Sequence, residues 1–155
     1  MASTFAELAE SPYIHSTYAM PLLSQSSYHP PLALCSGHLQ TIYPALFRKV
    51  PIITDRRERI ETPDGDFLDL DWKDCPSSRR LVILSHGLEG SSHQAYVQGM
   101  ARVFHETGWN ILAWNYRGCS GEINRRIKSY HSGATEDLHT VLNHVYEHYP
   151  VLEIA

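Results

Sequence analysis

The sequence predicts an α/β fold: a mostly parallel sheet with helices on both faces. Residues 81–84 and 109–115 form apolar runs that are typical of strands buried on both faces. Each run is followed by a segment with helical apolar spacing, and a further strand begins near residue 151. Strands that alternate with helices of this length predict βαβ units, and therefore a parallel sheet.

Composition limits the classes of protein that the chain fits. Of the 155 residues, 43% are hydrophobic and 19% are charged, which is enough apolar material for one folded domain. The net charge of −4 argues against a nucleic-acid partner, and the basic runs 56–57 and 125–128 are expected to be solvated faces. No apolar run approaches the ~20 residues that cross a bilayer. We therefore expect a cytoplasmic protein without a transmembrane segment.

The N-terminal third divides into an arm and a first helix. Residues 1–36 contain four prolines and no sustained period, so we expect an irregular arm there and a folded domain over 37–155. Residues 36–50 predict a short helix that is broken at Pro44. Its apolar residues are expected to face inward: Leu39, Ile42, Leu46 and Phe47.

A hairpin is predicted over residues 56–72. Pro63-Asp64-Gly65 is a turn signal, because proline presets φ, aspartate bonds back to the backbone and glycine accepts a positive φ. After the turn, apolar residues alternate with polar ones, which places Leu68, Leu70 and Trp72 on one face.

Two amphipathic helices follow the buried strands. The first, over about 92–107, has Ser91 or Ser92 as its N-cap and ends at Gly108. Its inward residues are Val97, Met100, Ala101 and Phe104. The second spans about 134–149, with Glu136 and Asp137 in its first turn, where the helix dipole favours anions. Its inward residues are Leu138, Val141, Leu142, Val145 and Tyr149.

The loop His86-Gly87-Leu88-Glu89-Gly90 follows the first buried strand. In open α/β sheets, ligands bind at the carboxyl ends of the strands, and backbone N–H groups there can hold the oxyanion of an acyl-transfer reaction. We predict that Leu88 N–H is such a donor, that His86 orders the loop, and that Gly87 and Gly90 shape it. The alternative is an ordinary strand-to-helix turn.

The next loop contains a near-match to the nucleophile motif G-x-S-x-G. In Gly118-Cys119-Ser120-Gly121-Glu122 the last glycine is missing, and no helix follows directly, so we predict a structural turn tied by Arg117 instead of a nucleophile at Ser120. A weaker alternative makes Cys119 a reactive thiol, with its pKa lowered by Arg117. Cys35, Cys75 and Cys119 form no CxxC pair.

Metal and cofactor motifs are also incomplete. His139, His144 and His148 lie on one predicted helix, but no cysteine or carboxylate set completes a metal site, so a solvated face is expected. Phosphate-binding glycine motifs are missing. The sequence thus implies neither a metal nor an organic cofactor.

Three segments together resemble one protein family. They are residues 37–41 (GHLQT), residues 86–90 (HGLEG), and residues 117–122 (RGCSGE) with 130–133 and 135–137 after them. In order and spacing they resemble the YheT-like branch of the α/β-hydrolase superfamily (AB hydrolase 4 type), from about residue 37 to the end. The resemblance implies that 37–155 is the N-terminal part of an α/β-hydrolase domain.

The resemblance also implies an activity. The full-length protein would be a serine carboxylesterase with a Ser–Asp–His triad, acting on short acyl esters or lipids without a cofactor. The nucleophile would follow the strand that begins at Val151, so this chain supplies the oxyanion loop but no triad, and we expect it to be inactive alone.

A second function remains open at this point. The chain would instead be a non-catalytic, truncated α/β module that binds a partner protein, which the sequence does not identify. If it ends before the last strand forms, the apolar edge at 81–84 is open, and we expect poor solubility or a partly molten state. A native mass well above 17.6 kDa would favour the esterase.

Overall fold

The computed structural model describes residues 27–131, 133–149 and 153–155. The chain divides into two compact units, residues 1–42 and 43–155. In the first unit, a 3₁₀ helix (Leu32–Leu34) precedes the start of helix α1 (Gly37–Phe47), and Gln40 Nε2 donates to Leu34 O at 2.8 Å. The other residues of the predicted arm, 1–26, lie outside the described part.

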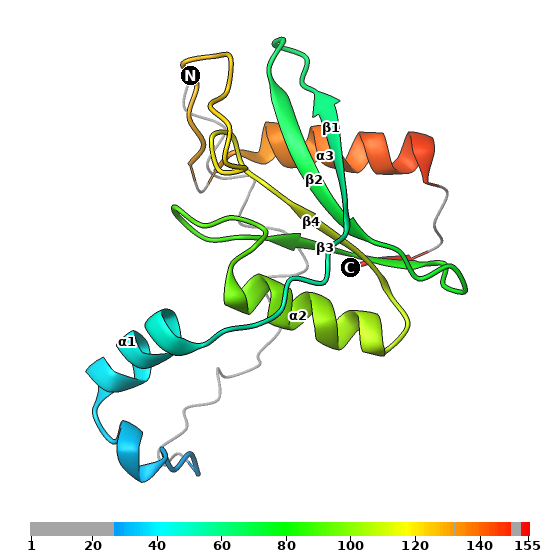
Figure 1. The fold of residues 1–155 in the computed structure, drawn as a ribbon. Helices are drawn as coiled ribbons and strands as arrows, with labels where there is room; N and C mark the ends of the chain where they lie inside the picture. The colour runs from blue at the N-terminus through cyan, green and yellow to red at the C-terminus, as the bar shows by residue number, and fades with distance from the viewer. Residues whose placement is uncertain (1–26, 132, 150–152) are drawn as a thin grey trace, which may run out of the picture. The chain divides into compact units, whose positions relative to one another are not determined.

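The second unit contains a five-stranded sheet with the strand order β1-β2-β4-β3-β5 (Figure 1). In chain order its elements are β1 (Arg56–Glu61), β2 (Phe67–Lys73), β3 (Arg80–Ser85), α2 (Ala95–Glu106), β4 (Asn110–Trp114), α3 (Thr135–His148) and β5 (Glu153–Ile154). The sequence of hairpin, strand, helix, strand, helix and strand is as predicted. The α/β class is therefore confirmed.

The sheet is mixed. β1 and β2 pair antiparallel around the turn at Gly65, whose φ is +78°, and β2 pairs antiparallel with β4. β4, β3 and β5 are parallel, because a helix crosses over between each strand and the next along the chain. The parallel half therefore carries the strand ends at which a ligand site is expected.

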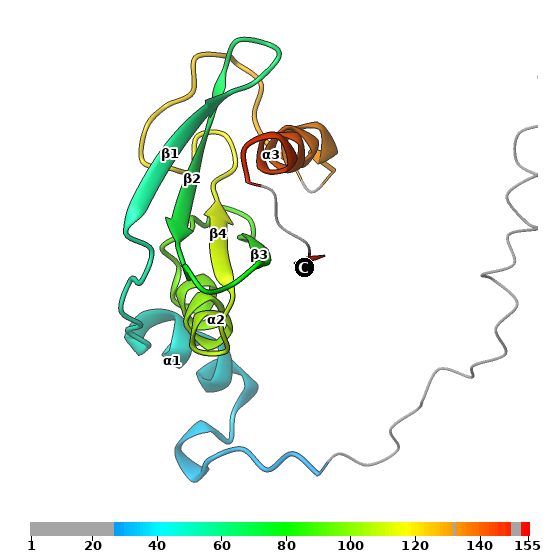
Figure 2. The ribbon, with the colours of Figure 1, turned by 90° about the vertical axis from the view of Figure 1, so that its right-hand side faces the viewer.

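α2 and α3 cover opposite faces of the sheet (Figure 2). Leu112 of β4 packs with Val141 and Val145 of α3, whereas its neighbour Ile111 packs with Ala101 of α2. Successive strand residues point to opposite faces, so a continuous apolar run is what a doubly covered strand requires. As predicted, Leu68, Leu70 and Trp72 share the α3 face.

The sequence-based description of α1 is wrong in two respects. The helix continues through Pro44, because a proline removes only its own hydrogen bond to the preceding turn, and Arg48 N–H still donates to Pro44 O at 3.1 Å. Its four apolar residues are also exposed instead of facing inward: Leu39, Ile42, Leu46 and Phe47. Apolar spacing identifies a face but not a surface that covers it.

The N-terminus of α2 also differs from the prediction. The helix begins at Ala95, and neither Ser91 nor Ser92 caps it; Gln94 stands at the cap position without a side-chain bond. Ser92 is fully buried and donates its hydroxyl proton to Asp71 at 2.5 Å, which removes it from the helix end. The predicted stop at Gly108 is confirmed by its φ of +83°.

The edge of β3 is partly paired. Arg80 and Leu81 pair with Glu153 and Ile154 of β5, and Ala155 exchanges two backbone hydrogen bonds with Leu81 and Ile83. The expectation of an edge open from Leu81 onward is therefore wrong, because β5 forms there.

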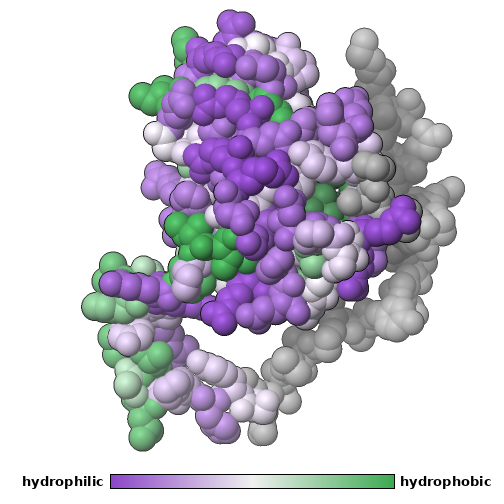
Figure 3. All heavy atoms as spheres, turned by 45° about the vertical axis from the view of Figure 1, so that its right-hand side comes forward, coloured by the Kyte–Doolittle hydropathy of each residue, from purple (hydrophilic) through white to green (hydrophobic). Residues whose placement is uncertain are grey.

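Figure 3 shows a mostly hydrophilic face with hydrophobic side chains in a few patches. Among the helices of the described residues, none is long and apolar enough to span a membrane.

Candidate oxyanion loop

The loop between β3 and α2, residues 86–92, is fastened at both ends to the residues that follow β4. At one end, Tyr116 N–H donates to His86 Nε2 at 3.1 Å. At the other, Ser92 N–H donates to the Asn115 side chain at 2.9 Å. Asn115 and Tyr116 are consecutive, so the parallel pairing of β3 and β4 sets the span of the loop. We call residues 86–92 the oxyanion loop, after the role that we propose for it below.

The His86 ring forms a hydrogen bond at each nitrogen, one to Gly87 and one to Tyr116. Because a backbone N–H donates to Nε2, that nitrogen carries no proton, and Nδ1–H is left to donate to Gly87 O at 2.8 Å. The ring is buried and meets Tyr116 edge-on at a centroid distance of 5.0 Å. Both ring nitrogens are thus engaged, which fits the predicted ordering role and leaves neither free to act as a base.

Residues 87–90 form a tight turn closed by a hydrogen bond from Gly90 N–H to Gly87 O at 3.0 Å. Glu89 adopts the left-handed conformation, with φ of +52°, which costs a non-glycine residue about 1–2 kcal/mol. A side chain at Gly90 would be crowded, because a Cβ there would lie 3.0 Å from Gly87 O and 3.2 Å from His86 Nδ1. Contacts from outside the turn must therefore stabilise it.

One N–H in this turn has no acceptor among the residues that the structure describes. Gly87 N–H donates to the Tyr96 hydroxyl and Glu89 N–H to the Tyr130 hydroxyl, both at 2.5 Å, while Gly90 N–H closes the turn. Within the described part of the chain, no group accepts a hydrogen bond from Leu88 N–H. Leu88 is 84% exposed, so the residue lies on an open part of the loop.

The direction of the Leu88 N–H is set by Gly87 O, the carbonyl oxygen of the same peptide group. Gly87 O accepts from both Gly90 N–H and His86 Nδ1–H on the inner side of the turn. In a trans peptide the N–H points opposite to the C=O, so anchoring Gly87 O inward directs Leu88 N–H outward. Hydrogen bonds to the carbonyl also polarise the peptide group and strengthen its N–H as a donor.

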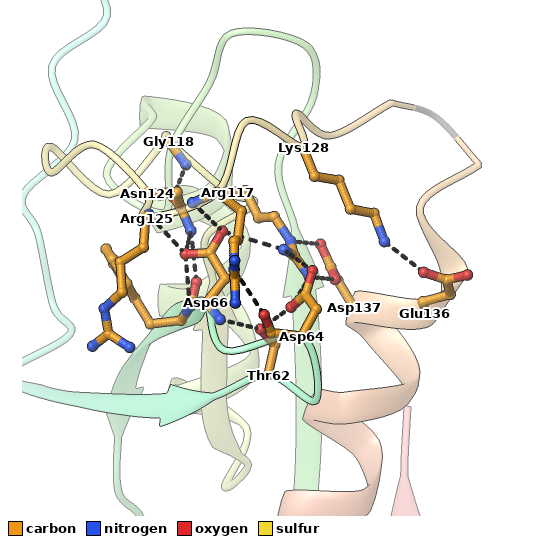
Figure 4. Close-up of polar contacts among 12 residues, drawn as sticks. Thr62, Asp64, Asp66, Arg117, Gly118, Asn124, Arg125, Lys128, Glu136 and Asp137 are labelled. Carbon is orange, nitrogen blue, oxygen red and sulfur yellow. Dashed lines mark hydrogen bonds and ion pairs between the residues drawn. The ribbon is translucent and has the colours of Figure 1, made fainter.

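A second set of polar residues lies on the other side of the β4 end. We call it the Arg117 cluster: Arg117 with Asp64, Asp66, Asn124 and Asp137 (Figure 4). The guanidinium donates to Asp137 at 2.7 and 2.9 Å, to Asp64 at 2.7 and 3.2 Å, and to Asp66 at 3.2 Å. It thereby joins the hairpin turn, the β4 loop and the first turn of α3, as predicted for a residue that ties this loop.

The pKa values of two carboxyl groups in the Arg117 cluster are lowered, one chiefly by the guanidinium and the other by hydrogen bonds. The guanidinium of Arg117, helped by the Thr62 hydroxyl, holds the pKa of Asp64 far below its usual range. Burial by itself would raise the pKa of Asp66, but hydrogen bonds from Asn124 and from the backbone N–H groups of Arg125, Phe67 and Arg126 outweigh it and lower the pKa. Both groups are therefore charged at neutral pH.

Ser120 and Cys119 are not arranged for nucleophilic chemistry. The Ser120 side chain helps to lower the pKa of Asp69, whose carboxylate is paired with Arg59 at 2.8 Å. Among the described residues, no histidine bonds to Ser120. Burial raises the pKa of Cys119, so the alternative of a thiol activated by Arg117 is wrong. The guanidinium of Arg117 is instead committed to the carboxylates of the Arg117 cluster.

The histidines of α3 form no metal site. His144 Nε2 lies 2.8 Å from Glu58, and its ring stacks on His148 at 4.4 Å. No group of three metal-ligating side chains occurs among the described residues.

An open groove of about 770 Å³ runs between the hairpin and α3, lined in part by His139, His144 and Arg117, but residues 86–92 do not line it.

The short basic runs are paired with acids. Arg57 binds Asp71 at 2.7 Å, and Arg125 binds Glu61 at 2.6 Å. Lys128 binds Glu136 at 2.5 Å. These runs therefore present less positive charge than their sequence suggests.

Two contacts of this turn were missed from the sequence. Tyr96 belongs to the first turn of α2 and Tyr130 to the long loop after β4, yet each hydroxyl accepts a hydrogen bond from the turn 87–90. Tyr130 is 41 residues from its partner Glu89. No local pattern signals such a contact, because it depends on the pairing of β3 with β4.

Comparisons with known proteins agree with this geometry. The chain is 41% identical over 128 residues to the protein named "Putative esterase YheT" of Escherichia coli (strain K12), covering 80% of the chain and 37% of that protein. It is 33% identical over 138 residues to human "Phospholipase ABHD3", covering 84% of the chain and 34% of that protein. The chain thus spans about a third of the length of these curated relatives. No model of a known protein family matches.

Solved structures show the same fold. An α/β serine hydrolase without a lid from Xanthomonas campestris superposes with a TM-score of 0.53 at 23% identity, over 68% of this chain and 50% of that one. An α/β serine hydrolase homologue from Coxiella burnetii gives 0.51 at 22% identity, over 68% and 51%.

The sequence relatives and the fold together are those of the α/β-hydrolases. The chain belongs to the YheT-like branch of that superfamily, and its homologues are hydrolases.

Proposed function

We propose that the full-length protein hydrolyses carboxylic esters, either short acyl esters or lipids, by way of an acyl-enzyme, and that Leu88 N–H stabilises the oxyanion. The observation that carries this is the backbone N–H of Leu88, an exposed residue after β3, for which no described residue supplies an acceptor. Attack on the ester carbonyl turns its oxygen into an oxyanion, and a fixed N–H donor lowers the energy of that intermediate without reorganisation.

The nucleophile is proposed to follow β5, as the family resemblance implies. β5 runs parallel to β3, with Arg80 opposite Glu153 and Leu81 opposite Ile154. The carboxyl ends of parallel strands meet at one edge of the sheet, so residues after β5 would lie beside the oxyanion loop. A serine there would attack the carbonyl, and its own N–H would supply the second donor.

The names of the relatives support the ester and lipid substrate classes. One is named an esterase and another a phospholipase. Acyl length and alcohol group depend on the rest of the substrate pocket, so the proposal extends only to the ester bond. No metal or cofactor is part of it, because attack, collapse and deacylation by water need only the triad and the oxyanion donors.

Substitution of Leu88 provides the test. Leu88 is the second residue of the turn 87–90, a position that proline favours, so Leu88→Pro removes the N–H with little disturbance of the turn. We expect kcat for p-nitrophenyl esters to fall about 10²–10³-fold in the full-length protein. Leu88→Ala keeps the N–H, so the ratio of the two kcat values isolates the donor. Equal kcat values for the two variants would refute the assignment.

Intact mass of the protein from its native source comes first. A mass well above 17.6 kDa and ester hydrolysis by that protein would support the proposal. A mass of 17.6 kDa without hydrolysis would favour the non-catalytic module that acts through a partner protein.

A further inference from the structure

We propose that Tyr96 and Tyr130 are positioning residues for the oxyanion donor: their hydroxyls hold the peptide groups on either side of Leu88. This inference rests on the proposed function and adds two residues to it. The Tyr96 hydroxyl accepts from Gly87 N–H and the Tyr130 hydroxyl from Glu89 N–H, each at 2.5 Å. The Leu88 N–H lies between these two fixed groups.

The two hydroxyls restrict the torsions that could turn the donor away. The direction of Leu88 N–H depends on the backbone torsions of Gly87 and Leu88, and glycine permits a wide range of them. Fixing the N–H before and the N–H after removes much of that freedom. It also leaves one donor in the turn for a ligand, since the neighbouring N–H groups already have acceptors.

Tyr130 is linked to β4 through a series of packed aromatic rings. Its ring stacks on Tyr116 at a centroid distance of 4.9 Å and an interplanar angle of 21°, and Tyr116 packs on Trp114 of β4 at 4.2 Å. Trp114 is fully buried in the core of the sheet. The hydroxyl is therefore tied to the central strand, although Tyr130 belongs to a long loop.

Tyr96 is tied to the opposite end of the oxyanion loop. It lies in the first turn of α2, and four residues before it Ser92 is locked by Asp71 and Asn115. Gly87 lies close to this hydroxyl: a Cβ on Gly87 would be 3.4 Å from the Tyr96 oxygen, an ordinary contact distance. Two separate elements thus hold the same turn, one on each side of the donor.

Tyrosine-to-phenylalanine variants of the full-length protein test the inference. Each loses one hydroxyl acceptor and keeps the ring, so we expect Tyr96→Phe and Tyr130→Phe to lower kcat about 2- to 10-fold, with KM unchanged within about twofold. The control is Tyr146→Phe, at a tyrosine that is 66% exposed on α3. The inhibition constant of a trifluoromethyl ketone, whose adduct carries an oxyanion, should rise by the factor by which kcat/KM falls.

Deuterium exchange at the amides of residues 87–89 gives a readout that does not depend on activity. Faster exchange in the Tyr96 and Tyr130 variants, but not in Tyr146→Phe, is expected. An active wild-type protein whose Tyr96 and Tyr130 variants match the control in kcat and inhibitor constant would overturn the inference and leave the proposed function standing. A loss of kcat that follows a lower melting temperature, without a weaker inhibitor, would also overturn it. An inactive wild-type protein would overturn the proposed function, and the inference with it.

Discussion

Two glycine-bearing loops end neighbouring parallel strands, and they treat their polar groups in opposite ways. In the loop after β4, Arg117 is 3% exposed and donates to three carboxylates. In the oxyanion loop after β3, the neighbouring N–H groups are satisfied but Leu88 N–H has no acceptor in the described part of the chain. Buried polar groups are normally paired, as they are in the loop after β4, where the pairing stabilises the structure. The Leu88 N–H of the oxyanion loop, in contrast, is open to a ligand.

The residues that follow β4 also support the oxyanion loop. Asn115 and Tyr116 fasten the ends of the oxyanion loop, and Tyr130 holds its turn. The Arg117 cluster anchors this support to the hairpin and to α3. A backbone donor whose neighbouring groups are held by several hydrogen bonds is what a preorganised oxyanion site requires.

Removing the guanidinium should have the largest effect on stability. Arg117→Met leaves Asp66 and Asp137, which are 0% and 3% exposed in their side chains, without a cation. Breaking a buried pair in this way costs about 3–5 kcal/mol of unfolding free energy. Urea unfolding of the full-length protein measures it. Arg125→Met, at a pair whose side chains are 50% and 63% exposed, is the control and should change little. Equal losses would show that the Arg117 cluster is not a structural anchor.

Acid should loosen the same cluster. The folded-state pKa of Asp64 is lowered by Arg117, so its contribution is fully present above the unfolded pKa of about 3.9 and is lost as pH falls below it. Asp66, also with a lowered pKa, acts in the same direction. The amide of Asp64→Asn does not titrate, so the unfolding free energy of this variant should decline less steeply than that of the wild type between about pH 4 and about pH 2. Parallel curves for the wild type and the variant would contradict this prediction.

The course of the chain follows from short-range patterns. Continuous apolar runs predicted β3 and β4, helical spacing predicted α2 and α3, and Pro63-Asp64-Gly65 predicted the hairpin turn. The same patterns were misleading at α1, whose apolar face is exposed, and at Ser92, whose side chain binds a distant carboxylate. Local sequence gives the period of an element but not the partner that its polar or apolar groups meet.

The candidate site was only half visible for the same reason. Residues 86–90 could be found because glycines after a buried strand have a local signature. No pattern in the sequence indicated that Asp69 and Asp71 are buried and paired with arginines 10 and 14 residues away. Tyr96 and Tyr130 become neighbours of the turn only after the sheet has formed. Contacts of this kind depend on strand pairing and have no local pattern.

A smaller effect separates the two glycines of the oxyanion loop. In Gly90→Ala, the new Cβ would press on Gly87 O at 3.0 Å, the oxygen that aims Leu88 N–H, whereas Gly87→Ala meets only Tyr96 at an ordinary 3.4 Å. Since Gly90 does not have a positive φ, crowding and not backbone strain distinguishes the two. We expect Gly90→Ala to lose about 1 kcal/mol of unfolding free energy and about tenfold in kcat, and Gly87→Ala to lose less of both. Urea unfolding and ester hydrolysis measure the two effects. If Gly90→Ala loses stability but keeps its kcat, the turn adapts and the direction of Leu88 N–H is not set by Gly87 O. If the two losses occur together, the crowded carbonyl is the link between the packing of the turn and the aim of its free donor.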